Sequence, residues 1–289
     1  MKTLLFLLNN RRNAREAILA ATQMAKILNV NLKILHISFP KPLSTPGIVV
    51  DLEMFHTNPE DYADTRTVEE IDKELIKLKT EGCISQNTDI EHQIGVSLFI
   101  VKKKFESGEF DYLALFQEEN TGPFNNPTIP VTLIRNIPCP TWILPFNFIP
   151  EHFRDLMYMT DYQKEDIHAL QKIFEILPQG TISSLDLVHL TDEANFQEEL
   201  LAVGFENLVK RKTDFEECRG IVKLNSGRDP ISLLINQLVN EKQIELVTVL
   251  KENRNILQKV FYRSFTEKML KNLNTPVLVL HQSNSQNTD

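Results

Sequence analysis

Residues 261–280, FYRSFTEKMLKNLNTPVLVL, decide how this chain is expected to fold. Ser264 or Thr266 can serve as the N-cap of a helix, because a short hydroxyl accepts a backbone N–H of the first helical turn. Pro276 keeps that helix from continuing. Residues 277–280 are all apolar, which is typical of a strand covered on both faces. The stretch therefore predicts a helix that runs into a buried strand.

Strands and helices alternate in the same way from the start of the chain. Residues 4–8 are apolar, apolar residues then recur with a helical period from Asn13 to Leu28, and a second apolar run follows at 32–37. This strand, helix and strand form a βαβ unit, which implies a parallel sheet with a right-handed crossover. The other elements predicted before residue 145 are a helix at 61–80, a strand at 90–94, a helix at 97–105, a strand at 110–116, a helix at 131–135 and a strand at 141–144.

The same order of elements repeats after residues 145–154, a stretch with two prolines and no helical period. Leu35-His36-Ile37 is echoed by Val188-His189-Leu190, which supports an internal repeat. The sequence therefore predicts a tandem duplication of one α/β unit, with domains at 1–147 and 148–289. The elements predicted in the second unit are strands at 156–160, 184–190, 244–250 and 277–280, the end of a strand at 220–224, and helices at 164–177, 193–212 and 230–240.

The cysteines and the two echoed histidines do not indicate a metal site. Cys83, Cys139 and Cys218 are widely spaced and odd in number, which argues against both a disulfide framework and a zinc site. His36 and His189 each follow an apolar strand and have no second ligand at metal spacing nearby in the sequence. We expect both to be strand-end histidines with hydrogen-bonding partners, and we expect no metal.

The net charge of the chain and its N-terminal residues indicate which binding partners and which cellular compartment to expect. The net charge is −8 and the pI is about 5.5, so nucleic acid and an anionic membrane are poor partners by bulk electrostatics. The apolar run near the N-terminus is too short for a signal peptide or a membrane span. We therefore expect a cytoplasmic protein that binds neither nucleic acid nor membrane.

The Ser-x-Thr-Glu-Lys helix running into Pro-Val-Leu-Val-Leu resembles the C-terminal end of a universal stress protein domain, and the order of elements extends this resemblance to both halves. The resemblance implies an α/β fold with two tandem doubly wound parallel five-stranded sheets, each with strand order 3-2-1-4-5. Ligands bind such sheets at the carboxyl ends of strands 1 and 4, where the strand order reverses. In the second half this crevice is flanked by Asp161 and by residues 251–264.

Universal stress proteins that bind ATP use the loop Gly-x2-Gly-x9-Gly-[Ser/Thr], whose glycines let backbone amides close on phosphate oxygens. With Ser264 at the final position, the three glycine positions fall on Leu250, Asn253 and Arg263, so all three glycines are absent. The family also uses an aspartate after strand 1 to contact the nucleoside, and Asp161 matches it. The resemblance therefore gives these candidate ligand residues: Asp161, Asn253, Arg263, Ser264 and Thr266.

The first half departs further from the family's pattern. Asn9 stands where the aspartate would be, Thr128 falls opposite Ser264, and Pro127 falls at a glycine position and has no N–H to offer a phosphate. We expect no nucleotide in this half.

Three functions fit these observations. The first is a non-enzymatic stress-response or small-ligand-binding protein that is not a tight ATP binder, with no cofactor expected. The second is a nucleotide-binding stress protein that holds ATP or AMP in its second domain. The third, a hydrolase or transferase, is least favoured, because the chain has no Gly-x-Ser-x-Gly, Walker A, Gly-x-Gly-x-x-Gly or His-Glu-x-x-His motif.

The resemblance also implies how the two halves associate. The closing strands at 141–144 and 277–280 would be sheet edges, and exposed apolar edges pair with other strands. We expect them to meet within one chain as a pseudo-dimer of the two domains. Whether two chains then form a homodimer stays open.

Overall fold

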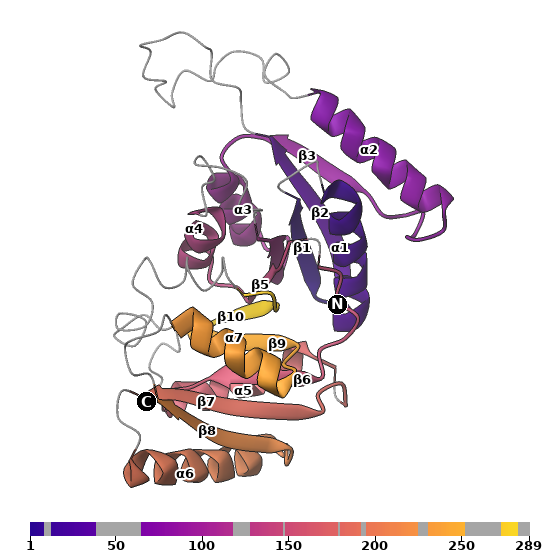
Figure 1. Cartoon of the computed structure of the whole chain (residues 1–289). Coiled ribbons are helices and arrows are strands. Elements are labelled where there is room, and N and C mark those ends of the chain that lie inside the picture. The colour runs from indigo at the N-terminus through magenta and orange to yellow at the C-terminus, as the bar shows by residue number, and fades with distance from the viewer. Residues whose placement is uncertain are drawn as a thin grey trace.

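The computed structural model describes residues 1–8, 13–38, 65–117, 128–146, 148–178, 180–191, 195–224, 231–251 and 273–282. Within these ranges strands and helices alternate in the predicted order (Figure 1). The first half contains β1 (Thr3–Leu8), α1 (Ala14–Leu28), β2 (Asn31–Ser38), α2 (Thr65–Thr80), β3 (Ile90–Ile94), α3 (Ser97–Glu106), β4 (Tyr112–Phe116), α4 (Thr128–Asn136) and β5 (Thr141–Leu144). The second half contains β6 (Asp155–Met159), α5 (Lys164–Ile176), β7 (Ser184–Thr191), α6 (Phe196–Thr213), β8 (Cys218–Leu224), α7 (Ile231–Lys242), β9 (Leu246–Lys251) and β10 (Val277–His281).

The described strands form one ten-stranded sheet with the order β3-β2-β1-β4-β5-β10-β9-β6-β7-β8. Each half is parallel and has the order 3-2-1-4-5 when its own strands are counted from one to five. β5 and β10 pair antiparallel, with Val277 opposite Ile143. The predicted fold class, the strand order and the meeting of the two closing strands within one chain are confirmed. Because of this pairing, the two five-stranded sheets are continuous. The domain boundary at 147/148 stays a prediction.

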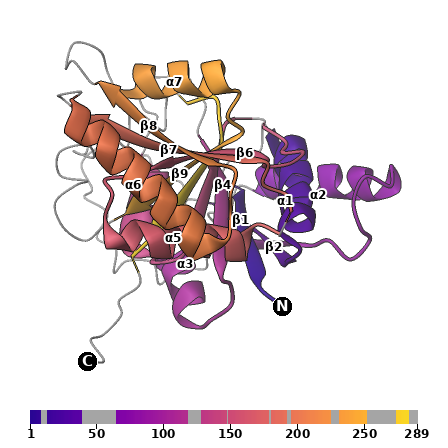
Figure 2. The same cartoon turned by 90° about the horizontal axis from the view of Figure 1, so that it is seen from below.

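Helices cover both faces of the sheet. α1, α2, α5 and α6 pack into one buried cluster, and α3, α4 and α7 pack into the other. Figure 2 shows this for the second half, where α5 and α6 lie on one side of the strands and α7 on the other. The continuous apolar run of β1 follows from this arrangement, because Leu4 and Phe6 enter the first cluster while Leu5 and Leu7 enter the second. None of the helices in the described part of the chain is long and apolar enough to cross a membrane.

Element boundaries differ from the predictions where a cap decides them. The sequence predicts α6 from residue 193, whereas the helix begins at Phe196, because the side-chain oxygen of Asn195 accepts the Glu198 N–H at 3.0 Å. β8 extends back to Cys218, which pairs with Leu185 of β7, and residues 220–224 are the end of this strand, as predicted. The helix predicted after Ser264 lies outside the described residues, whereas the strand predicted after it is present as β10.

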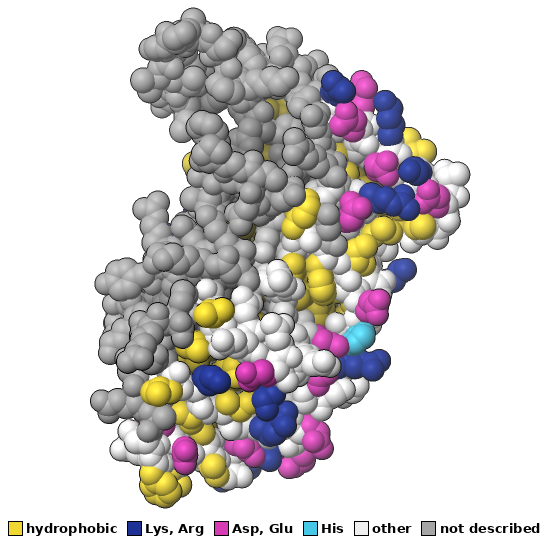
Figure 3. Space-filling view, viewed as in Figure 1, with side chains coloured by type: hydrophobic (Ala, Val, Ile, Leu, Met, Phe, Trp, Pro, Cys, Tyr) yellow, Lys and Arg dark blue, Asp and Glu magenta, His cyan; other side chains and the backbone are white. Residues whose placement is uncertain are grey.

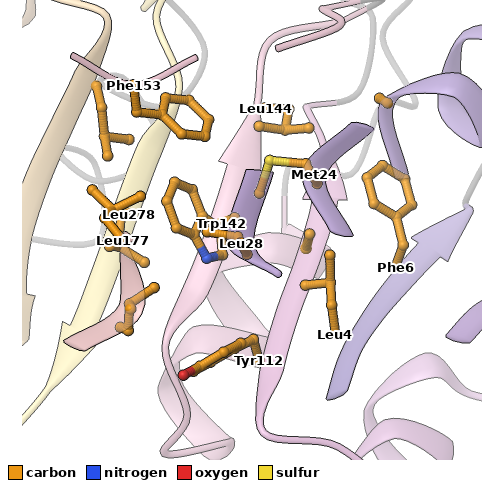
Figure 4. Packing of buried hydrophobic residues seen from close by; sticks show 14 of the residues in the cluster. Leu4, Phe6, Met24, Leu28, Tyr112, Trp142, Leu144, Phe153, Leu177 and Leu278 are labelled. Atoms are coloured by element: carbon orange, nitrogen blue, oxygen red, sulfur yellow. The ribbon is translucent and has the colours of Figure 1, made fainter. Parts of the chain in front are cut away.

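The two halves are joined by packing as well as by strand pairing. Trp142 of β5 is fully buried and its ring lies 5.0 Å from that of Phe153, which precedes β6. Figure 4 shows Trp142 between first-half side chains and the second-half residues Phe153, Leu177 and Leu278. Gln117, which follows β4, donates its side-chain N–H to the Leu273 carbonyl at 3.3 Å. The junction is therefore a continuous core.

Candidate functional site

The strand order of the second half reverses between β6 and β9, as that of the first half does between β1 and β4. This point of an open α/β sheet is where ligands bind, outside the carboxyl ends of the strands. Two charged residues of the second half lie at these strand ends within the described ranges. Asp161 follows β6, and Lys251 is the last residue of β9. These two residues mark the candidate site.

The turn that carries Asp161 is organised by a different carboxylate, that of Asp166 in the first turn of α5. Asp166 is buried and accepts hydrogen bonds from the Tyr158 hydroxyl at 2.7 Å and the Thr160 hydroxyl at 2.7 Å. The backbone N–H groups of Gln163 and Asp161 donate to the same carboxylate at 3.0 and 3.3 Å. Burial raises the pKa of Asp166, and these four hydrogen bonds oppose the rise. Asp166 thus fixes the backbone from which Asp161 projects.

His189 of β7 holds the Asp161 side chain. Its Nδ1 donates to the Thr160 carbonyl at 2.8 Å and lies 3.3 Å from an Asp161 carboxylate oxygen, while its Nε2 lies 3.6 Å from the Glu198 carboxylate of α6. Because a carbonyl can only accept, Nδ1 carries a proton and Nε2 is the nitrogen that titrates. Burial lowers the pKa of His189, but the hydrogen bonds to Asp161 and Thr160 and the nearby carboxylates outweigh it, so the pKa is raised.

The side chain of Tyr162 packs against the imidazole of His189. Tyr162 adopts a left-handed backbone conformation with φ of 60°, and its ring lies 4.6 Å from that of His189 and 5.4 Å from that of Phe205. Burial raises the pKa of Tyr162 to about 12, and the charges of Glu198 and Asp161 add to the rise. Its hydroxyl is buried and has no hydrogen-bond partner among the described residues. A neutral aromatic ring therefore lies against His189, the partner of Asp161.

Lys251 points from β9 to the first half. Its ammonium group donates to the carbonyls of Ile134 and Arg135 at the end of α4, at 2.8 and 3.1 Å. Burial lowers the pKa of Lys251, and the charge of Arg135 lowers it further. Next to it on β10, burial followed by the charge of Lys251 lowers the pKa of His281 to about 4, so His281 is neutral near pH 7. The charged group of Lys251 thus binds backbone carbonyls of the first half, at the junction of the two halves.

The first half has a different group at the matching place. His36 of β2 faces His92 of β3, with their Nδ1 atoms 3.1 Å apart, and Nε2 of His92 lies 3.0 Å from the Asp72 carboxylate of α2. Both echoed histidines therefore have partners, as predicted. Their partners are distant in the sequence, which is why the sequence did not reveal them. No group of three or more His, Cys, Asp or Glu in the described ranges could hold a metal ion.

Solved structures share this arrangement over nearly the whole chain. A universal stress protein from Archaeoglobus fulgidus aligns with a TM-score of 0.65 and 13% identity, over 96% of this chain and 98% of that one. A Pseudomonas aeruginosa protein provisionally described as a universal stress protein aligns with a TM-score of 0.61 and 14% identity, over 97% and 93% of the two chains.

The chain has the universal stress protein fold. A second Pseudomonas aeruginosa protein, of unknown function, shares this fold with a TM-score of 0.61 and 15% identity, over 98% of this chain and 94% of that one. Comparisons with protein-family models and with curated proteins find no match.

Of the candidate residues that the resemblance to universal stress proteins gives, only Asp161 is placed. It lies at the end of β6, where that fold puts the crevice, and is partly exposed. The other four, Asn253, Arg263, Ser264 and Thr266, lie outside the described residues, as does Asn9 of the first half. Sequence reasoning missed Tyr162 and Glu198 altogether. Tyr162 could have been noticed because it directly follows the candidate aspartate in the sequence. Nothing in the sequence pointed to Glu198.

Proposed function

We propose that this chain is a non-enzymatic stress-response protein of the universal stress type that does not hold ATP tightly. The universal stress protein fold over both halves supports the first part of this proposal. One observation carries the second part. The Asp161 carboxylate, the group matched to the nucleoside contact, already has a partner in His189, 3.3 Å away.

The charges around Asp161 also disfavour a triphosphate. His189 lies between two carboxylates, those of Asp161 and Glu198, so this group carries a net negative charge even when the imidazole is protonated. Like charges within a few ångströms repel, and the repulsion is strongest where solvent is partly excluded. The ammonium group of Lys251, at the end of β9, is hydrogen-bonded to the end of α4. A neutral or cationic small molecule would meet less repulsion here than a nucleotide.

The three cysteines give no support to an enzymatic function. Two of the three cysteine thiols are buried, and burial raises the pKa of Cys139 to about 12 and that of Cys218 to about 11. A thiol is nucleophilic as the thiolate, so both are unreactive near pH 7. The third, Cys83, is exposed and lies in a turn near the exposed carboxylate of Glu81, away from the strand-end crevices.

Thermal denaturation with and without Mg·ATP tests the proposal. A ligand at about one hundred times its dissociation constant adds about 2.7 kcal/mol to the free energy of unfolding. We expect about 1 mM Mg·ATP, a concentration well above the dissociation constant of a tight site, to leave the melting temperature of the protein unchanged. AMP should behave in the same way.

A variant with the three family glycines restored, Leu250→Gly/Asn253→Gly/Arg263→Gly, serves as comparator, each protein being compared with itself with and without ligand. A gain of ATP-dependent stabilisation in this variant alone would support the proposal. A clear shift in the natural protein that is lost in Asp161→Ala would overturn it in favour of the ATP- or AMP-binding alternative. Release of phosphate from ATP, lost in the same variant, would establish an enzyme.

A further inference from the structure

α6 exposes an unusual number of large apolar side chains. Ten large hydrophobic residues are exposed in the described part of the chain. Four of them belong to the first eight residues of α6: Phe196, Leu200, Leu201 and Val203. Phe196 is 78% exposed and Leu200 is 61% exposed. In Figure 3, hydrophobic side chains lie at the lower end of the molecule, where Figure 1 places the start of α6. The surface of this helix therefore differs from the polar outer face that is usual for a surface helix.

Three of these side chains form one stripe. Phe196, Leu200 and Val203 are spaced by four and three residues, which brings them onto the same face of a helix. The opposite face is already used, since Ala202, Phe205 and Val209 are buried against the sheet. The stripe faces away from the core and has no described partner within the chain.

Gly204 lies beside the stripe in the middle of α6. A glycine within a helix costs about 1 kcal/mol relative to alanine. No neighbour among the described residues requires it, because a Cβ built at Gly204 would meet none of their atoms within 4 Å. At Gly220 of β8, in contrast, a Cβ would come within 2.8 Å of the Ala202 carbonyl oxygen, so the packing of α6 on the sheet requires that glycine. The absence of a side chain at Gly204 leaves room for a second helix to approach closely.

The charges of α6 favour a particular partner. Glu199 is exposed in its first turn, whereas Glu198 lies against His189. Its last turn carries Lys210, which is paired with Glu206, and Arg211 and Lys212, which are exposed. A second α6 packed antiparallel would place each acidic end against a basic end. A two-fold axis near the middle of the helix would also bring the two copies of Val203 and Gly204 together. We propose that two copies of this chain associate through antiparallel packing of their α6 stripes.

This surface is separate from the junction of the two halves. α6 packs on β8, at the far end of the sheet from the β5–β10 pair. β8 is itself an edge strand, but one of its backbone N–H groups, that of Gly220, already donates to the Glu206 side chain of α6 at 2.9 Å. The exposed apolar side chains that the proposed contact buries lie on the helix and not on the strand edge.

The molar mass of the full chain, measured by light scattering over a range of concentrations, tests the proposal. We expect a dimer at about 100 μM protein, because a contact of two helices is a small interface with a dissociation constant in the micromolar range. Val203→Glu buries two like charges at the two-fold axis and should raise the dimer dissociation constant about a hundredfold or more. Ile76→Glu, at an exposed apolar position of α2, is the matched control and should leave it unchanged. Circular dichroism checks that both variants fold.

Cross-linking tests the two-fold geometry. In a Cys83→Ser background, which removes the exposed thiol, Val203→Cys should form a disulfide between two chains under mild oxidation, whereas Phe99→Cys on α3 should not. A natural protein that stays monomeric at the highest concentration would overturn the proposal and indicate that another protein or another segment of this chain covers the stripe. So would a dimer that tolerates Val203→Glu, or one in which Val203→Cys gives no cross-link.

Discussion

The carboxyl ends of β1 and β6 can be compared position by position, because the two strands open the two halves. Three buried positions lie at equal distances from the strand starts: Phe6, Leu8 and Ala14 in the first half, and Tyr158, Thr160 and Asp166 in the second. The first set is apolar. The second set forms the hydrogen-bonded turn that presents Asp161.

The histidines differ in the same sense. His36 faces another histidine, whereas His189 faces two carboxylates. Both lie near the end of the second strand of their half. The two halves therefore share the backbone position of this histidine but not the side chains around it. The comparison teaches that a duplicated fold preserves where a crevice lies without preserving what the crevice contains. Three changes would break or sharpen it.

The largest effect is expected at the junction. Trp142→Ala should lower the free energy of unfolding by about 3–5 kcal/mol, because it removes a fully buried aromatic side chain from the core that both halves share. Denaturant titration should show a single transition at lower denaturant, and Trp142→Phe should lose less. Two separate transitions in the natural protein would contradict a common core.

The next effect concerns the network that only the second half contains. Asp166→Ala should cost about 2–4 kcal/mol of unfolding free energy, because it leaves buried hydroxyl and N–H groups without their acceptor. Tyr158→Phe should cost less in the Asp166→Ala background than in the natural protein, since the hydrogen bond between Tyr158 and Asp166 is then already absent. A double-mutant cycle measured by denaturant unfolding gives this coupling. Additive losses would show that the two groups act independently.

The smallest effect depends on pH. The pKa of His189 is raised in the folded protein, so its contribution to stability is present in full below the unfolded value, about 6.5, and is lost as the pH rises through the folded pKa. The melting-temperature difference between the natural protein and His189→Gln should therefore be largest near pH 5 and shrink toward about pH 8. His36→Gln, on the equivalent strand of the first half, is the comparison variant, because its imidazole faces that of His92. Equal profiles for the two variants would contradict the distinction between the halves.

The fold could be predicted because its signals are local. Continuous apolar runs such as residues 4–8 and 277–280 mark strands covered on both faces, and the alternation with helices limits the topology. The order 3-2-1-4-5 came with the resemblance to universal stress proteins rather than from the pattern itself. Boundaries such as the start of α6 depend on a cap, Asn195, which competes with neighbouring residues in the sequence.

The candidate site could be predicted only in part. Asp161 was found because the resemblance to universal stress proteins implies an aspartate after the first strand of the unit. Its contact with His189 depends on the register between β6 and β7, and the contact of His189 with Glu198 depends on how α6 packs on the sheet. Neither contact can be predicted from the spacing of residues along the chain.

The antiparallel joint between β5 and β10 has a consequence for how the molecule can change over time. In an assembly of identical subunits, every substitution appears on both sides of the interface at once. Here each substitution appears once, and the covalent connection keeps the two sides together at any dilution. One side of the joint is therefore free to become an inert scaffold while the other retains or acquires a specialised task.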